Sequence, residues 1–471
     1  MSVVIRIGVL CGVVTFATTG VLDAAPEPPT FAKDVAPILF AKCANCHRPG
    51  EVAPMPLLTY AQARPWAKAI REKVVNREMP PWGADPKFGT FRNALSLTDQ
   101  EIATIDAWVA GGSRRGNDAD LPPPPQAVTG WLAGSDPDYI AEMPQEFNVP
   151  AEGELNTLLF YTKVPFAEDR FARLLEWRPG NRSVVHHGVA FVGDLPQGSN
   201  VDANGELILA DGTRENHLTA QSRISNALTR SRMNLLVDYV PGRYAIPGRS
   251  PNIGARIPAG KHFKFNLHYQ PSGQPEKDRS RIGMWFTTND RVQELYRREV
   301  GQSLPTAKDR TAFYRIQGVT TLHTPGNGRE ESDWPPIAPF DRNYTVLAVT
   351  PIVEPITLYG FTPHMHLRGK DKTWFVTWPD GRTEVLLSIP KYDFNWQYYY
   401  ELDRPLKVPA GSTLSNIAHY DNTPGNKYNP APDRPVFWAE QSWDEMYCPF
   451  IVYTVDSEEP KSKRRDTPLQ R

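Results

Sequence analysis

The pattern of apolar residues changes near residue 115, from a helical period to short alternating runs. Before that point, apolar side chains recur three and four residues apart over residues 31–39, 63–74 and 102–108. Thr98 and Glu101 form a capping-box sequence ahead of the third stretch. The pattern therefore predicts a small all-α domain of three helices.

Beyond residue 130 the sequence predicts many short strands separated by turns that contain Gly and Pro. The predicted strands are Asn156–Val164, Val184–Val192, His262–Tyr269, Arg281–Thr287, Tyr344–Val349, Thr373–Trp378 and Pro435–Trp438. Strands of this length and spacing are typical of β-sandwich and jelly-roll domains. We expect two of them, because roughly 330 residues exceed one domain of about 100–200 residues.

An internal repeat supports two related β domains. Ile257-Pro258-Ala259-Gly260 precedes His268-Tyr269, and Val408-Pro409-Ala410-Gly411 precedes His419-Tyr420 at the same spacing. Each copy follows an earlier pair of histidines, which favours a duplication. The predicted organisation is a signal peptide (1–25), a helical domain (26–115), a Pro-rich linker (116–130), two β domains (131–300 and 301–456) and a charged tail (457–471).

Composition and charge exclude several classes of protein. The 471 residues include 52 Lys and Arg against 53 Asp and Glu, which argues against a nucleic-acid-binding protein. Four cysteines in a chain of this length cannot form a disulfide scaffold. Arg6 precedes a short apolar run from Ile7 to Leu22, which is typical of a secretory signal peptide. We expect a periplasmic or secreted protein without a membrane span after cleavage, with a retained N-terminal anchor as the alternative.

Cys43-Ala44-Asn45-Cys46-His47 is a C-x-x-C-H sequence, which predicts a covalent haem c. Two thiols so spaced on a helix can form thioethers to the haem vinyl groups, and His47 can bind the iron. A redox or zinc C-x-x-C is the alternative, and the adjacent histidine and the export signal disfavour it.

Met79 is the predicted second axial ligand, because it lies in a loop stiffened by Pro80 and Pro81. Met55 is its rival. His/Met ligation suits electron transfer. The segment resembles the class I cytochromes c over about 85 residues, on its C-x-x-C-H and three-helix pattern.

Histidines cluster unevenly in the β region, which predicts a metal site. His186 and His187 are adjacent, so both can bind one metal only at a bend or a strand end. His364 and His366 share one face of a strand, and His268 and His419 occupy the repeated position. Imidazole admits Zn, Cu, Fe or Ni, whereas a thioether such as Met446 favours copper. Isolated His217, His262 and His323 are read as structural.

These motifs resemble the copper type II, ascorbate-dependent monooxygenases, the peptidylglycine α-hydroxylating and dopamine β-hydroxylating enzymes. The resemblance rests on His186-His187, Asn266-Leu267-His268-Tyr269, Pro363-His364-Met365-His366 and Asp444-Glu445-Met446, in that order. It implies two jelly-roll domains and two copper ions. An electron-transfer copper would bind His186, His187 and His268, and a catalytic copper would bind His364, His366 and Met446.

The resemblance leaves some features open. The eukaryotic enzymes are disulfide-rich, whereas the β region here contains only Cys448. His419 is an additional candidate ligand, a candidate hydrogen-bond donor to one, or a structural residue. Nothing matches a known peptide or catecholamine pocket.

The sequence thus predicts an exported monooxygenase that hydroxylates a C–H bond of an unknown small organic substrate with O2. Electrons would enter from ascorbate or a redox protein at the haem, and then pass through one copper to the other. The alternatives are a non-catalytic copper and haem protein for electron transfer or copper binding, and a haem-coupled dehydrogenase.

Overall fold

The computed structural model describes residues 27–462 apart from 50, 52, 127–129, 154, 218–232, 241–244, 247–249, 308–311, 323–333 and 440. The predicted signal peptide, His323 and most of the predicted charged tail lie outside the described residues. Among the helices that are described, none is long and apolar enough to cross a membrane.

The fold differs from the predicted class. The chain is mostly β, with 37% strand and 12% helix, and its sheets have a four-blade, propeller-like arrangement. The prediction of a small all-α class I cytochrome c domain followed by two all-β jelly-roll domains is therefore wrong.

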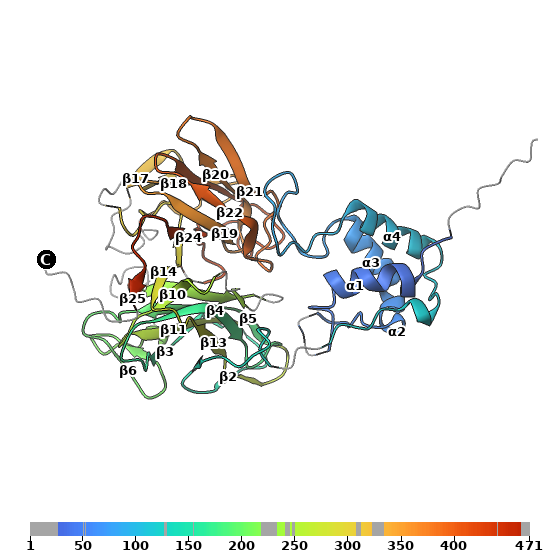
Figure 1. Cartoon of the computed structure of the whole chain (residues 1–471), viewed down its shortest axis with the longest axis horizontal. Helices are drawn as coiled ribbons and strands as arrows, with labels where there is room; N and C mark the ends of the chain where they lie inside the picture. The colour runs from blue at the N-terminus through green and yellow to red at the C-terminus, as the bar shows by residue number, and fades with distance from the viewer. Residues whose placement is uncertain are drawn as a thin grey trace, which may run out of the picture.

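The N-terminal helices are few, short and interrupted (Figure 1). They are η1 (Phe31–Val35), α1 (Ala36–Lys42), α2 (Tyr60–Ala63), η2 (Arg64–Trp66), α3 (Ala67–Val75), α4 (Asp99–Ala110) and η3 (Asp118–Asp120). Prolines 49, 54 and 56 lie between α1 and α2, and prolines 80, 81 and 86 lie between α3 and α4. Because proline removes a helix donor and clashes with the preceding turn, these connections are irregular.

The predicted capping box at the start of α4 is confirmed. Thr98 Oγ1 accepts a hydrogen bond from the Glu101 N–H at 3.2 Å, and the Glu101 carboxylate accepts one from the Thr98 N–H at 2.7 Å. The two bonds satisfy donors that a helix leaves unpaired at its first turn.

Two large sheets make the first β half. One has the order β1-β13-β4-β10-β14-β25 with β9 beside β4, and the other has the order β3-β11-β5-β8. The strands are β1 (Tyr139–Glu142), β3 (Leu158–Lys163), β4 (Arg170–Arg178), β5 (Val185–Gly193), β8 (Met233–Tyr239), β9 (Ala245–Ile246), β10 (Ile253–Ile257), β11 (His262–Tyr269), β13 (Arg281–Phe286), β14 (Arg291–Glu294) and β25 (Lys461–Ser462). Small additions are η4 (Glu215–His217) and the pairs β2 (Phe147–Val149) with β12 (Glu276–Asp278) and β6 (Asn200–Val201) with β7 (Leu207–Ile208). One apolar core, including Trp177 and Phe265, lies between the two large sheets.

Two further sheets make the second β half. Their orders are β15-β24-β19-β22 and β17-β16-β18-β23-β20-β21. The strands are β15 (Tyr296–Glu299), β16 (Phe313–Ile316), β17 (Val319–Leu322), β18 (Tyr344–Pro351), β19 (Ile356–His364), β20 (Gly369–Thr377), β21 (Thr383–Ile389), β22 (Tyr400–Val408), β23 (Thr413–Tyr420) and β24 (Cys448–Val455). Phe361 and Trp374 from the two sheets meet in the core, with ring centroids 5.6 Å apart.

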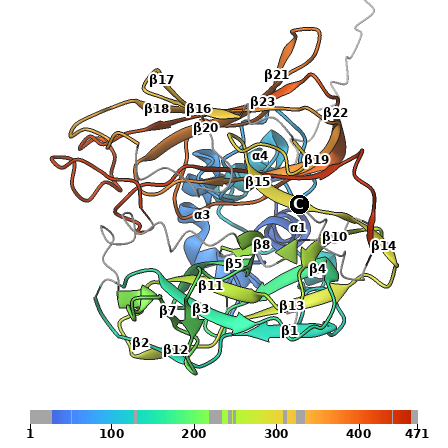
Figure 2. The same cartoon turned by 90° about the vertical axis from the view of Figure 1, so that its left-hand side faces the viewer.

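The two β halves, which lie one above the other in Figure 2, are joined by a strand from near the C-terminus, so they are not independent domains. β25, near the C-terminus, pairs with β14 of the first half. A segment of the N-terminal part, residues 82–93, hydrogen-bonds to the second half, where Phe91 forms a β-bridge with Leu402. We call it the docking segment, and it is the blue loop beside β21 and β22 in Figure 1.

Candidate metal centres

A β-bulge brings the adjacent histidines to one site. His187 lies opposite His268 on the neighbouring strand β11, but Tyr269 lies opposite Val185, so His186 is the extra residue. A bulge bends the strand and redirects a side chain. The bulge at His186 supplies the bend that is required if His186 and His187 are to bind one metal ion. Gly188 follows the bulge. A larger residue would not fit there, because a Cβ would lie 2.5 Å from the ring of Trp177.

His186, His187 and His268 form a cluster suited to a metal ion, and we call it the first histidine set. One nitrogen from each ring lies within 4.8 Å of the other two. His186 Nδ1 and His187 Nδ1 are 3.1 Å apart. His268 Nδ1 is buried without a hydrogen-bond partner among the described residues, while its Nε2 lies 3.2 Å from Ser442 Oγ. An unpaired buried nitrogen beside two others is placed to bind a metal ion.

Burial keeps these imidazoles neutral. It lowers the pKa of His186 and His187 and brings the pKa of His268 down to about 3. A neutral imidazole is the form that binds a metal. The first set is therefore ready to bind a metal ion near neutral pH without losing protons.

His364 and His366 form the second histidine set. His364 is the last residue of β19, and His366 lies in the turn beyond it, so the two do not share a strand as predicted. Their ring centroids are nevertheless 5.1 Å apart. His366 Nδ1 lies 3.3 Å from the Asp444 carbonyl oxygen, which only accepts, so the proton is on Nδ1 and the lone pair is on Nε2. Burial lowers the pKa of His366 well below its usual range.

Glu445 ties Met446 to the second set. Its buried carboxylate accepts backbone hydrogen bonds from His366 at 2.9 Å, from Arg368 at 2.6 Å and from Met446 at 3.2 Å. Burial raises the pKa of Glu445 to about 7, and these donors act against that rise. Sequence reasoning assigned no role to Glu445, although it lies next to Met446 in the quoted motif.

Residues 393–398 form a loop that contacts both histidine sets, and we call it the bridging loop. Asn395 Oδ1 lies 3.3 Å from His186 Nε2, and Gln397 Oε1 is hydrogen-bonded to His364 Nδ1. The Phe394 ring stacks on His186 with centroids 5.5 Å apart and meets His366 edge-on at 5.9 Å. Sequence reasoning missed this loop, because it has no periodicity and no motif.

His419 lies elsewhere. It is on β23, which belongs to the other sheet of the second half from β19. Its Nδ1 is 2.6 Å from the Asp371 carboxylate on the neighbouring strand β20. This contact with Asp371 agrees with a structural role for His419, the third of the roles considered above.

The C-x-x-C-H segment follows α1. His47 Nδ1 is 3.0 Å from the Met55 carbonyl oxygen, so the proton lies on Nδ1 and the lone pair on Nε2, the state of an iron-bound imidazole. Cys43 and Cys46 are not in a disulfide. Burial raises the pKa of the Cys43 thiol to about 12 and that of Cys46 to about 11.

Met79 lines a cavity of about 380 Å³ together with Val74, Trp82, Leu97 and Ile102. Cys43 and Ile102 contact the same apolar core of the N-terminal part, so this cavity and the C-x-x-C-H segment border one core. The Met55 carbonyl oxygen is hydrogen-bonded to His47 Nδ1, and the choice of Met79 over Met55 as second axial ligand stays a prediction.

The C-x-x-C-H segment also contacts the β region. Glu51 forms an ion pair with Arg182, three residues before β5. Tyr398, at the end of the bridging loop, is buried, and its hydroxyl has no hydrogen-bond partner among the described residues. Burial and the nearby Cys46 raise its pKa far above the usual range.

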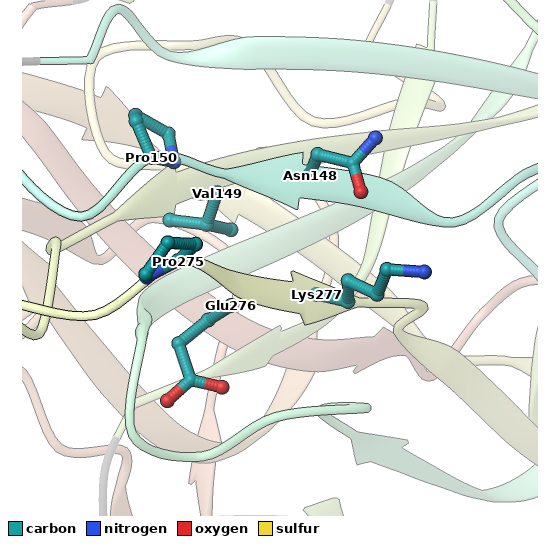
Figure 3. Close-up of a pocket in the computed structure, with 6 residues that line it drawn as sticks. All are labelled: Asn148, Val149, Pro150, Pro275, Glu276 and Lys277. Atoms are coloured by element: carbon teal, nitrogen blue, oxygen red, sulfur yellow. The ribbon is translucent and has the colours of Figure 1, made fainter.

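A separate surface pocket of about 530 Å³ lies between Asn148–Pro150 and Pro275–Lys277 (Figure 3). None of the histidines, methionines or cysteines discussed above lines it. It therefore lies apart from both histidine sets and from the C-x-x-C-H segment.

Comparison with known proteins assigns no family. No family model matches the chain, and no curated protein matches it. Among solved structures, an allantoicase is 13% identical over 59% of this chain and 81% of its own, with a TM-score of 0.15. The infectious bursal disease virus Gx strain is 11% identical over 69% and 76%, with a TM-score of 0.16. A CBM22 tandem domain from Paenibacillus barcinonensis Xyn10C is 8% identical over 71% and 95%, with a TM-score of 0.13. Scores this low carry no argument about fold or function.

Proposed function

We propose that the protein is an exported monooxygenase that uses covalent haem and two copper ions to hydroxylate a C–H bond of a small organic substrate with O2. The observation that carries the proposal is the first histidine set. A strand bulge places an adjacent histidine pair and a later histidine so that three ring nitrogens lie within 4.8 Å of one another.

In the first set, the residues fit a metal bound through Nδ1. Asn395 Oδ1 accepts the proton of His186 Nε2, and the Asn395 amide is itself fixed by donating to Asp393 at 3.0 Å. Ser442 fixes the ring of His268 from its Nε2 side. Partners on the far ring nitrogen orient a ligating histidine and raise its basicity.

In the second set, His364, His366 and Met446 would hold the other ion. Gln397 and the Asp444 carbonyl accept the Nδ1 protons of the two histidines, which directs their Nε2 lone pairs to a ligand. A thioether stabilises Cu(I), the form of copper that reacts with O2. Glu445 fixes the backbones of His366 and Met446, so it holds the ligands in register.

In the N-terminal part, Cys43, Cys46, His47 and Met79 would hold the haem. A haem with His and Met ligands supplies single electrons at a raised potential. The Glu51–Arg182 ion pair and the docking segment fix this part against the β region that contains both histidine sets. The expected outside partners are ascorbate or a redox protein as electron donor, and O2 and the organic substrate.

Replacing Met446 by Leu tests the proposal. Leucine keeps the volume and removes the sulfur. We expect the copper-loaded variant to produce at least about 100-fold less hydroxylated product. Loss of a group that only supports a metal ligand already lowers metal affinity or activity by about 10–100-fold, and Met446 is proposed to bind the metal directly. The assay is incorporation of ¹⁸O from ¹⁸O2 into a panel of small organic compounds, read by mass spectrometry. Haem reduction should be unchanged.

Met284→Leu is the matched control, because Met284 lies buried in the core of the first half, outside the metal centres. Hydroxylation by Met446→Leu at the rate of Met284→Leu would overturn the assignment of Met446. If no compound gains ¹⁸O although haem and copper are bound, the non-catalytic electron-transfer or copper-binding alternative is preferred.

A further inference from the structure

A lysine points into the core of the second β half. Lys372, Trp374 and Val376 alternate along β20 as its buried residues, and Lys372 is completely buried. Lysine is seldom buried to this extent, because the removal of an ammonium group from water is costly in free energy. A lysine at this position therefore calls for a compensating role.

The Lys372 side chain reaches from one sheet of the second half to the second histidine set on the other sheet. Its Nζ donates a hydrogen bond to the carbonyl oxygen of His364, the last residue of β19, at 2.9 Å. The same Nζ lies 4.5 Å from the centre of the Tyr447 ring, which makes a cation–π contact. Tyr447 directly follows Met446. One side chain thus contacts the backbone of one proposed ligand and the neighbour of another.

The surroundings of Tyr447 and Met446 are rigid. The Tyr447 hydroxyl lies 2.9 Å from the Asn416 carbonyl oxygen and 2.7 Å from the oxygen of its side-chain amide. The Met446 carbonyl oxygen accepts a hydrogen bond from the Tyr420 hydroxyl at 2.9 Å. Asn416 and Tyr420 both lie on β23, the strand that pairs with β20. Two hydrogen-bonded strands therefore set the position of the Lys372 ammonium group beside the second set.

A fixed positive charge beside a copper site acts unequally on the two oxidation states of the metal. It repels Cu(II) more strongly than Cu(I), because the Coulomb energy is proportional to the product of the charges. Burial strengthens the effect, since water and salt screen a buried charge less than an exposed one. The thioether of Met446 also favours Cu(I), so the lysine and the thioether would act in the same direction.

We propose that Lys372 is a positioning residue of the second histidine set, which holds His364 and Tyr447 in place and whose charge increases the preference of the set for Cu(I) over Cu(II). The inference rests on the proposed function for the identity of the metal. It adds to the second set a residue that the pattern of copper ligands in the sequence does not contain, and it accounts for a buried lysine in an apolar core.

Binding of Cu(I) and Cu(II) to the second set alone tests the inference. The parent is the full-length haem protein with His186→Ala and His268→Ala, which removes two of the three residues of the first set. Copper retained after equilibrium dialysis against a competing chelator is counted by elemental mass spectrometry, with a reductant for Cu(I) and without one for Cu(II). The ratio of the two affinities is the preference for Cu(I), and a tenfold change in it corresponds to about 59 mV in reduction potential.

In this parent, Lys372→Met and Lys372→Gln should each lower the preference for Cu(I) by at least about tenfold. Methionine removes the charge and the hydrogen bond, whereas glutamine removes the charge and keeps an N–H donor for His364. The melting temperature of the metal-free protein checks that both variants fold, and glutamine alone decides if methionine does not. Lys407→Met is the matched control, because Lys407 lies on β22 with 75% of its side chain exposed, and its preference should equal that of the parent.

The outcomes separate the inference from the proposed function. An unchanged preference in both Lys372 variants, or an equal loss in Lys407→Met, would overturn the inference and leave the monooxygenase proposal standing. A loss in Lys372→Met but not in Lys372→Gln would show that the hydrogen bond alone acts, and would overturn the role of the charge. A parent that binds no copper would overturn the proposed function of the second set and the inference with it.

Discussion

At the scale of single residues, position in a sheet decides which repeated histidine joins the first histidine set. His268 and His419 occupy equivalent places in the sequence repeat, each at the end of a strand. His268 is paired with His187 across two hydrogen-bonded strands, whereas His419 is paired with Asp371 in the sheet that excludes β19. Identical spacing in the sequence therefore leads to different surroundings.

The lowered pKa of His268 predicts a loss of stability in acid for the metal-free protein. The unfolded chain binds a proton at His268 below pH 6.5, but the folded chain binds it only near pH 3. Because the unfolded state holds more protons in that window, stability falls as pH drops from 6.5 towards 3. The melting temperature of chelator-treated protein should therefore fall less steeply with pH in His268→Asn. Equal slopes for variant and wild type would contradict this.

Replacing Glu445 by Gln should weaken the second histidine set. Above pH 8 Glu445 is charged, because its pKa is about 7. Hydrogen bonds to a charged acceptor contribute about 1.5–3 kcal/mol, and the carboxylate accepts three backbone N–H groups, so the comparison is made above pH 8. We expect a loss of about 2 kcal/mol in the free energy of unfolding in urea and a loss of copper from the second set. Glu384→Gln, at an exposed position of β21, is the control. Full copper loading of Glu445→Gln would show that this carboxylate does not hold the ligands in place.

At the scale of elements, the apolar pattern located most strands but predicted nothing about their pairing. The predicted strand His262–Tyr269 is β11 with the same bounds, because polar and apolar residues alternate strictly along it and every apolar one is buried. Pro435–Trp438 forms only isolated bridges, from Val436 to Ile337 and from Trp438 to Glu445. The alternation of apolar and polar residues shows which face of a strand is buried, but it does not show which strand lies beside it. The arrangement of the sheets and the position of the bridging loop could therefore not be predicted from the sequence.

The ion pair between Glu51 and Arg182 predicts a link between the C-x-x-C-H segment and β5. Both side chains are largely buried, with 13% and 24% of their surface exposed. We expect Arg182→Gln to lower the free energy of unfolding by about 1–3 kcal/mol, because it leaves a buried carboxylate without its cation. Exchanging the charges, with Glu51→Arg and Arg182→Glu together, should restore part of the loss. No recovery in the double variant would argue against a direct pair.

At the scale of the whole molecule, the docking segment fixes the N-terminal part to the second β half. Trp82 packs on Tyr400 with ring centroids 4.7 Å apart, and Asp85 and Arg92 donate backbone hydrogen bonds to the second half at 2.8 and 2.9 Å. The segment begins three residues after Met79, so the predicted haem ligand and the contact with the β region lie on one continuous stretch.

Trp82→Ala should destabilise the protein and loosen this docking. Truncating a packed tryptophan costs about 3–5 kcal/mol, and the half-buried position places Trp82 near the lower value. The free energy of unfolding and protection of residues 82–93 from limited proteolysis should both fall. Trp66→Ala is the control, because Trp66 is 45% exposed and should change stability by less than about 0.5 kcal/mol. Equal effects of the two variants would mean that the docking contact contributes nothing specific.

The central claim, that one chain combines haem with two copper ions, is tested most directly by its cofactor content. The full-length protein is produced in the periplasm of a host that attaches haem c, and is analysed by intact mass, a haem spectrum and elemental mass spectrometry. We predict one covalent haem and two copper ions per chain, with copper reduced in His187→Ala and haem absent in Cys46→Ala. A chain with no covalent haem, or with zinc in place of copper in both histidine sets, would contradict the account.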